Sequence, residues 1–169
     1  PYLVPNTSIF LDAGTTVMSL VRQLPNQHYT IVTSGANIAI ELSQRSRSTV
    51  SCVGGQISSS TLSLSGPQAE AFLATVNIDT AVLAATGYST GAGFTVGSYT
   101  ENSLKRRVIQ KADKVILLID RSKLGRTLPF TFASLSDIDV VICDAPLPED
   151  FIQAARAAGT EVLQVQPAK

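Results

Sequence analysis

The chain has 169 residues, of which 44% are hydrophobic, so it is long enough for one substantial core and short for two. Its 13 Lys and Arg residues balance its 13 Asp and Glu residues, which argues against a general electrostatic attraction to nucleic acid or an anionic membrane. No stretch approaches the length of a membrane span, and the N-terminus lacks a signal-like pattern. We therefore expect one cytoplasmic domain, residues 1–169, with no membrane partner.

Short apolar runs alternate with amphipathic runs along the chain. The apolar runs predict strands at 8–11, 29–33, 49–53, 80–84, 115–119, 139–143 and 161–165. Helical spacing predicts helices at 16–24, 36–44, 67–76, 101–112 and 148–158. This order is typical of an α/β fold with a mainly parallel sheet and helices on both faces. Segment 58–66 alternates polar with apolar residues and is expected to add a small edge strand, whereas the glycine-rich segment 87–97 is expected to be a loop.

The first predicted strand runs directly into the turn DAGTT, Asp12 to Thr16, and a helix follows at once. The first N–H groups of a helix have no intrahelical partner, and they suit an anion. Gly14 would let a ligand approach the backbone, and the hydroxyls of Thr15 and Thr16 would cap the helix or donate to a phosphate. The alternative is an ordinary capped turn with Asp12 facing water.

Small, hydroxyl and charged residues recur after successive predicted strands. Beyond the first strand they are Thr33, Ser34 and Gly35, then Gly54 and Gly55, then Ala85, Thr86 and Gly87, then Asp120, Ser122 and Lys123, and finally Asp144. Ligands gather at the carboxyl ends of parallel strands, so the repetition predicts a binding site. The alternative is that loops are always rich in such residues.

Other reactive side chains give weaker signals. The basic group Lys105, Arg106, Arg107 and Lys111 is typical of the solvent-exposed face of a helix. Cys52 and Cys143 lie in apolar runs, which indicates buried thiols rather than a metal site or a disulfide. The single histidine, His28, lies in a polar turn, so we expect neither a histidine metal site nor a Ser-His-Asp site.

The motifs together carry a resemblance. Six motifs occur in order between about Ser8 and about Val165: FLDAGTT, VTSGANIA, VGGQISSSTLSLSGPQA, TGYSTGAGFTVGSYTENSLKRRVI, VILLIDRSKLG and DIDVVICDAPL. In this order they resemble the effector-binding domain of DeoR-family bacterial transcriptional regulators. The resemblance implies a fold similar to pentose-phosphate isomerases and CoA transferases, and a sensor of phosphorylated sugars or related metabolites. Such regulators begin with a winged helix-turn-helix. None precedes Pro1, so we expect the sensor part alone, with DNA bound only through that N-terminal domain.

The resemblance also implies a ligand site. Asp12, Gly14, Thr15 and Thr16 match the family's phosphate-loop motif, Gly54 and Gly55 its glycine pair, Glu101 and Lys105 its E-x-x-x-K pattern, and Asp120 and Lys123 its D-x-S-K motif. Ala13, Ser34 and Gly87 complete the expected ligand-binding set. The family often has Thr-Asn-Ser where this chain has Thr33, Ser34 and Gly35, and a serine hydroxyl reaches less far than an amide.

Charge suggests a division of roles among these residues. The helix start at Thr15 and Thr16, with Lys123, would hold the phosphate, and Asp12 and Glu101 would accept hydrogen bonds from sugar hydroxyls. We expect no catalytic residue, cofactor or metal, and a homo-oligomer, either a dimer or a tetramer. The alternative is a sugar-phosphate isomerase-like enzyme, in which carboxylates at the related positions transfer protons.

Overall fold

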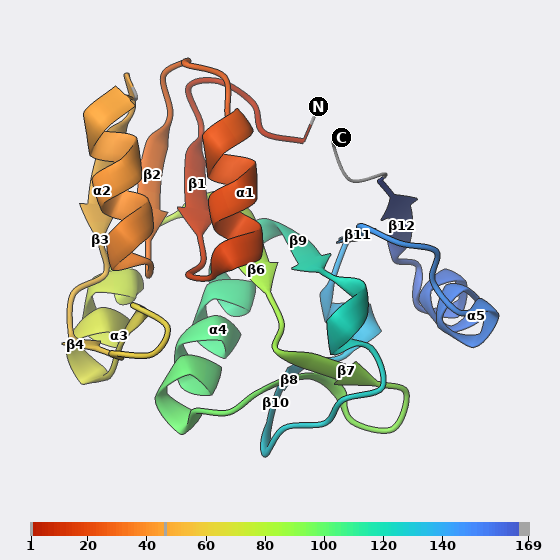
Figure 1. The fold of residues 1–169 in the computed structure, drawn as a ribbon. Coiled ribbons are helices and arrows are strands. Elements are labelled where there is room, and N and C mark those ends of the chain that lie inside the picture. Colours follow the sequence, from red (N-terminus) through yellow and green to blue (C-terminus); the bar gives the residue numbers. More distant parts are fainter. Residues whose placement is uncertain (1, 46, 166–169) are drawn as a thin grey trace.

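The computed structural model describes residues 2–45 and 47–165, and its centre is a seven-stranded parallel sheet (Figure 1). The strand order is β12-β11-β9-β6-β1-β2-β3. The bounds are β1 (Ser8–Leu11), β2 (Thr30–Thr33), β3 (Thr49–Cys52), β6 (Ile78–Ala84), β9 (Ala112–Ile119), β11 (Val140–Cys143) and β12 (Glu161–Gln164). All seven coincide with predicted strands, which confirms the predicted fold class.

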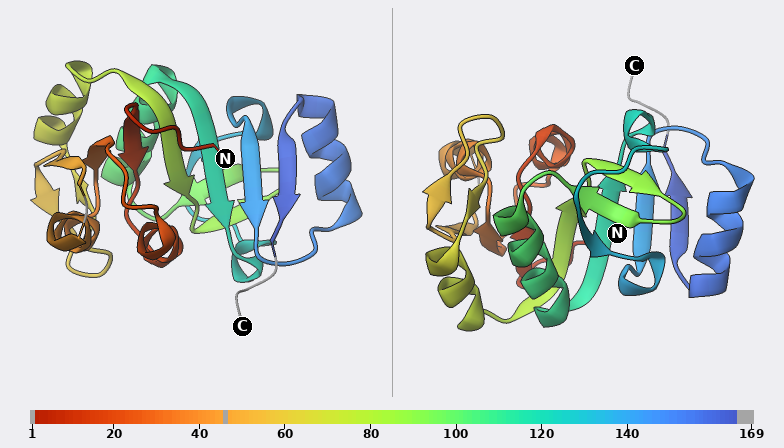
Figure 2. Two further views of the ribbon diagram at one scale, coloured as in Figure 1. Left: turned by 90° about the horizontal axis from the view of Figure 1, so that it is seen from above. Right: turned by 90° about the horizontal axis from the view of Figure 1, so that it is seen from below.

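Five helices cover the two faces of this sheet (Figure 2). They are α1 (Thr15–Gln23), α2 (Ala36–Arg45), α3 (Pro67–Ala74), α4 (Tyr99–Lys111) and α5 (Glu149–Ala158). Buried side chains of α1 and α2 pack with one face of the sheet, whereas those of α3, α4 and α5 pack with the other. The prediction of helices on both faces is therefore confirmed. Among the residues described, no helix is both long enough and apolar enough to cross a membrane.

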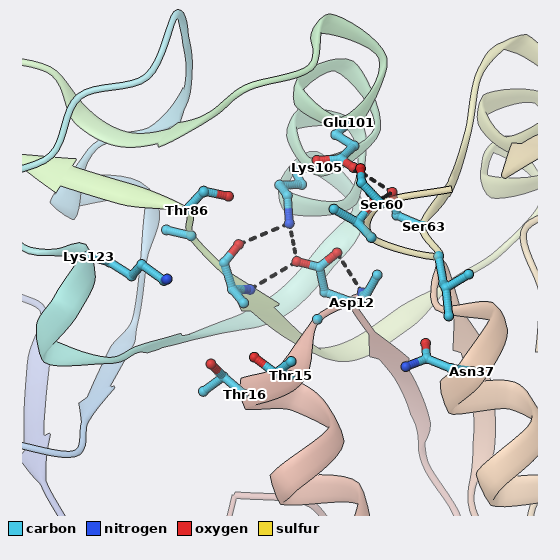
Figure 3. Close-up of a pocket in the computed structure, with 16 residues that line it drawn as sticks. Asp12, Thr15, Thr16, Asn37, Ser60, Ser63, Thr86, Glu101, Lys105 and Lys123 are labelled. Atoms are coloured by element: carbon cyan, nitrogen blue, oxygen red, sulfur yellow. Dashed lines mark hydrogen bonds and ion pairs between the residues drawn. The ribbon is translucent and has the colours of Figure 1, made fainter. Parts of the chain in front are cut away.

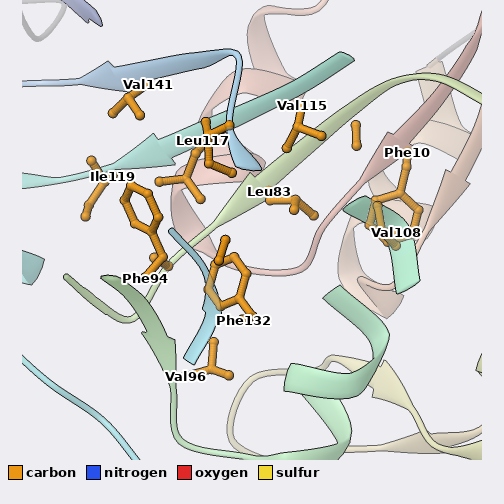
Figure 4. Packing of buried hydrophobic residues seen from close by; sticks show 14 of the residues in the cluster. Phe10, Leu83, Phe94, Val96, Val108, Val115, Leu117, Ile119, Phe132 and Val141 are labelled. Atoms are coloured by element: carbon orange, nitrogen blue, oxygen red, sulfur yellow. The ribbon is translucent and has the colours of Figure 1, made fainter. Parts of the chain in front are cut away.

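A small antiparallel sheet lies where a loop was predicted, so that expectation was wrong. It consists of β7 (Gly87–Ser89), β8 (Gly93–Val96) and β10 (Phe130–Ala133), in the order β10-β8-β7. Phe94 and Phe132 are buried and face the main sheet at Leu117 and Ile119 (Figure 4). Gly93 looks like a loop signal in the sequence, but in the structure it has a packing role. Its φ is +73°, and a Cβ there would lie 2.5 Å from the Ala133 carbonyl oxygen.

The expected edge strand in segment 58–66 forms only in part. Leu64 and Ser65 make up β5, which pairs with β4 (Gln56–Ile57) in a separate two-stranded sheet. Between β4 and β5 the chain makes a loop, residues 58–63, which includes Leu62 at φ 54°. This loop forms one wall of the pocket described below.

The two cysteines differ in exposure, and one expectation about them was wrong. Cys143 is fully buried in β11, and burial raises the pKa of its thiol. Cys52 is exposed because β3 is an edge strand with no neighbour beyond it in the sheet. An apolar run indicates a strand, but it does not say whether that strand lies at the centre or at the edge.

We predict that the two thiols react differently with an aromatic disulfide reagent. In the folded protein Cys52 should be labelled promptly, because the reagent needs an accessible thiolate. Cys143 should be labelled only after unfolding in denaturant. The measurement is the number of protein thiols that react with the reagent before and after denaturation, with Cys52→Ser and Cys143→Ser as matched variants. Equal native rates for both thiols would contradict the burial described here.

Candidate functional site

A pocket of about 380 Å³ opens at the carboxyl ends of the central strands, between α1, α4 and the loop at residues 58–63 (Figure 3). Its lining includes hydroxyl, carboxylate, amide and ammonium groups. The lining residues are Asp12, Ala13, Gly14, Thr15, Thr16, Asn37, Ser60, Thr61, Leu62, Ser63, Ala84, Ala85, Thr86, Glu101, Lys105 and Lys123. Residues from the predicted strand ends therefore line a pocket, and their role in binding a ligand stays a prediction.

Asp12, at the end of β1, lies on the floor of the pocket and is only 4% exposed. Its Oδ1 accepts hydrogen bonds from the Ala13 amide (2.9 Å) and the Ser34 hydroxyl (3.2 Å). Its Oδ2 accepts from the Ala84 amide (2.9 Å) and from Lys105 Nζ. A carboxylate offers about four lone-pair positions, so these four donors occupy all of them. The alternative placed Asp12 facing water, and that part of it was wrong.

Lys105 points inward from α4, which corrects the expectation that its basic cluster is solvent-exposed. The residue is 6% exposed, and its ammonium group pairs with Asp12 and donates to the Ala84 carbonyl at 3.0 Å. It also lies 5.4 Å from the centre of the Phe132 ring, a cation–π distance. Arg106 and Arg107 are exposed as expected, because successive helical residues point in different directions.

Glu101 lies one turn before Lys105 on the same face of α4. Its Oε1 accepts hydrogen bonds from the hydroxyls of Ser63 (2.5 Å) and Thr61 (3.1 Å). Its backbone N–H donates to the hydroxyl of Ser98, which caps the helix. The carboxylate thus fixes the loop at residues 58–63 to α4. Its Oε2 has no hydrogen-bond partner among the described residues.

The first turn of α1 forms another wall of the pocket. Gly14 is the N-cap at φ 121°, a backbone angle that side-chain-bearing residues rarely adopt, and its carbonyl accepts the Met18 amide at 3.0 Å. No side chain caps this helix, so the expected capping by the threonine hydroxyls does not occur. Thr15 is exposed and Thr16 is partly exposed at the pocket.

Lys123 closes the pocket on the side opposite Asn37 (Figure 3). It ends a short 3₁₀ helix, Arg121–Lys123, whose N-cap is Asp120. The Asp120 carboxylate accepts from the Ser122 amide at 2.9 Å and lies 3.9 Å from Lys123 Nζ. Both side chains are 30% exposed, so this ion pair is weak and leaves the ammonium group accessible.

The structure brings together most of the predicted site residues. Eight of them line the pocket: Asp12, Ala13, Gly14, Thr15, Thr16, Glu101, Lys105 and Lys123. Ser34 donates a hydrogen bond to Asp12. The other four, Gly54, Gly55, Gly87 and Asp120, are not among the described lining residues. At two of these positions packing explains why the residue is a glycine. A Cβ on Gly55 would lie 2.3 Å from the Ser65 carbonyl oxygen, and a Cβ on Gly87 would lie 2.6 Å from the Arg126 carbonyl oxygen.

Sequence reasoning missed the wall formed by Asn37 and the loop residues Ser60, Thr61, Leu62 and Ser63. Asn37 lies inside a predicted helix and the loop lies in a predicted strand, so neither looked like a strand end. Ala84, Ala85 and Thr86 also line the pocket, and the strand-end pattern had pointed to the last two. Within the described residues, no cluster of metal-ligating side chains is present.

We predict that Asp12 and Lys105 are energetically coupled. Removing one partner leaves a buried charge unpaired, so Asp12→Asn and Lys105→Met should each reduce the free energy of unfolding by about 3–5 kcal/mol. The double variant should lose less than the sum, by roughly 0.5–3 kcal/mol. Urea denaturation measures all three values. As a control, Arg107→Met breaks an exposed pair with Glu70 at 4.0 Å and should cost about 0.5 kcal/mol or less. Small, strictly additive losses would refute the coupling.

Comparison with known proteins identifies the family. Residues 2–145 match the model of the DeoR C terminal sensor domain. The chain is 36% identical over 156 residues to the HTH-type transcriptional regulator GlpR of Haloferax volcanii, covering 92% of this chain and 61% of that protein. It is 31% identical over 155 residues to the HTH-type transcriptional repressor GlcR of Bacillus subtilis, covering 92% and 60%. The chain thus spans about three-fifths of the length of these relatives.

A solved structure supports the fold. The chain is similar to ribose 5-phosphate isomerase A from Methanocaldococcus jannaschii, with a TM-score of 0.51 and 16% identity, over 75% of this chain and 50% of that one. At this identity the likeness concerns the fold alone. The sequence relatives, in contrast, carry the family assignment: this chain belongs to the DeoR-family sensor domains that its own motifs resemble.

Proposed function

We propose that this domain is the ligand-sensing part of a DNA-binding transcriptional regulator, and that its ligand is a phosphorylated sugar or a related metabolite. The observation that carries the proposal is the arrangement of charge in the pocket. Lys105 is paired with Asp12, whereas Lys123 is only weakly paired and lines the same pocket as the N-terminus of α1 at Thr15 and Thr16. An accessible ammonium group that shares a pocket with a helix N-terminus suits a phosphate.

The opposite part of the pocket suits the sugar hydroxyls. Glu101, Ser60 and Thr61 line this part of the pocket. Figure 3 shows the side chains of Glu101 and Ser60 close to each other. We assign hydroxyl recognition to Glu101 rather than to Asp12, because four protein donors already occupy the carboxylate of Asp12. Asp12 then acts as a positioning residue, which holds Lys105 and the ends of β1 and β6 in place.

A sugar-phosphate isomerase is the competing function, since the fold resembles one. Proton transfer between sugar carbons requires a carboxylate oxygen within hydrogen-bond reach of the substrate, and both oxygens of Asp12 already accept from protein donors. The similar curated proteins are named as transcriptional regulators. We therefore favour a sensor without catalytic activity, acting in the cytoplasm. Incorporation of solvent deuterium into pentose or hexose phosphates would instead support the isomerase.

Regulation of DNA binding would follow from a ligand-dependent change in subunit arrangement. A ligand shifts such an equilibrium only through different affinities for the two arrangements. DNA contact would come from a helix-turn-helix like the one named in the relatives, and not from this domain. Symmetric DNA sites are read by symmetric proteins, so we propose that this domain forms a homo-oligomer.

We predict self-association of the purified domain. Sedimentation velocity at micromolar concentrations should give the mass of a dimer or a tetramer. A monomer at all concentrations up to about 100 μM would count against the domain as the source of symmetry, without bearing on ligand binding.

We predict that phosphorylated sugars raise the melting temperature of the domain. A ligand at about a hundred times its Kd adds roughly 2.7 kcal/mol to the free energy of unfolding, which means a rise of roughly 5–11 °C. Lys123→Ala should reduce this rise by removing the accessible cation. Gly14→Val should abolish it by straining the turn and blocking the backbone, provided that circular dichroism shows a folded variant.

Matched controls separate phosphate recognition from general effects on stability. Lys114→Ala makes the same change at an exposed position away from the pocket and should leave the rise intact. The unphosphorylated sugars should give little rise with the wild-type domain. If the free sugars act as well as their phosphates, or if Lys123→Ala and Gly14→Val both keep the full rise, the phosphate does not bind at this turn.

A further inference from the structure

Among the described residues that line the pocket, Asn37 carries a buried hydrogen-bonding atom without a partner. This residue lies in the first turn of α2 and lines the pocket. Its Oδ1 is buried and has no hydrogen-bond partner among the described residues. Within the same residues, the other such atom is Asn102 Nδ2, which lies outside this pocket. Buried polar atoms are nearly always paired in folded proteins, so the orphan oxygen of Asn37 requires an explanation.

The backbone around Asn37 is fixed, so its position is not an accident of a loose loop. The Ala36 amide donates to the Leu62 carbonyl at 3.0 Å, and the Leu64 amide donates to the Ser34 carbonyl at 2.7 Å. These bonds join the start of α2 to the loop at residues 58–63, where Leu62 adopts a left-handed conformation at φ 54°. Such strain is characteristic of ligand-contacting segments. Asn37 is therefore held at the wall opposite Lys123 (Figure 3).

Three of the four carboxylate oxygens of the pocket residues Asp12 and Glu101 already accept hydrogen bonds. Both oxygens of Asp12 are fully used, and Glu101 Oε1 accepts two hydroxyls. Asn37 Oδ1, in contrast, has no donor in the part of the chain that the structure describes. The terminal torsion of an amide is soft, so a small rotation can present this oxygen to a bound donor. A hydrogen bond from the ligand to this oxygen is therefore gained without breaking a hydrogen bond within the described protein.

The chemistry of this acceptor specifies the ligand group. A phosphate dianion offers acceptors, so it cannot satisfy an amide oxygen, whereas a hydroxyl donates to the oxygen and also accepts from the amide nitrogen. We propose that Asn37 is a specificity-determining residue that binds one hydroxyl of the ligand, at the end remote from the phosphate. This inference rests on the proposed function, because the phosphate at Lys123 sets the direction of the ligand.

The test measures discrimination rather than affinity alone. By calorimetry, wild-type protein is titrated with aldose and ketose phosphates of five and six carbons, and then with every monodeoxy analogue of the tightest binder. We expect one analogue to bind at least about 10-fold more weakly, because it leaves the amide unpaired. In Asn37→Ala that analogue and the parent sugar phosphate should bind within about 2-fold of each other.

Two further variants make the result specific. Asn77→Ala is the same change at an exposed position outside the pocket, and it should keep the wild-type ratio. Asn37→Asp retains the acceptor, so it should also keep the discrimination, although its charge weakens the binding of every sugar phosphate. If Asn37→Ala does not fold, the aspartate variant decides the question, and loss of discrimination in it overturns the proposal.

The remaining outcomes separate this inference from the proposed function. If wild type binds a sugar phosphate but Asn37→Ala keeps the wild-type ratio for every analogue, Asn37 does not read a hydroxyl, and the proposed function stands. If wild type binds none of the sugar phosphates, the sugar-phosphate ligand of the proposed function is wrong, and this inference fails with it.

Discussion

The ion pair between Asp12 and Lys105 is the interaction on which the rest of the site depends. Burying two charges is costly, and their attraction offsets the cost only when the remaining lone pairs and protons are also satisfied. Here the Ala13 and Ala84 amides and the Ser34 hydroxyl complete the carboxylate, and the Ala84 carbonyl accepts from the lysine. The pair therefore joins β1, β6, α4 and the segment after β2 at one point.

The shape of the pocket follows from that junction. Because Lys105 draws α4 against the end of β6, Glu101 one turn earlier is placed to hold Thr61 and Ser63. The loop at residues 58–63 then lies against the start of α2 and brings Asn37 to the wall. One side of the pocket thus carries acceptors, and the side formed by α1 and Lys123 carries positive charge. A ligand with a phosphate at one end and hydroxyls at the other matches this polarity.

The amino-acid sequence by itself determined the fold class, the seven main strands and the five helices. These features follow from local hydrophobic periodicity, which is set by which side chains each strand or helix must bury. It also indicated DAGTT and Lys123 as site residues, because the carboxyl ends of parallel strands converge at one edge of a sheet whatever the order of the strands. Glu101 entered the expected site only through the resemblance to the family. The order of the motifs indicated the DeoR family, which the comparisons confirm.

Only the tertiary structure decided which residues at those strand ends face the pocket, and which of their polar atoms already have hydrogen-bond partners. The strand order put β3 at the edge and exposed Cys52, and periodicity does not encode that order. Lys105 and Arg106 look alike in the sequence, yet only Lys105 meets a buried carboxylate, from a residue 93 positions earlier in the chain. Asn37 likewise became a candidate only when its neighbours were known, because whether a polar atom is satisfied depends on groups that distant segments bring beside it.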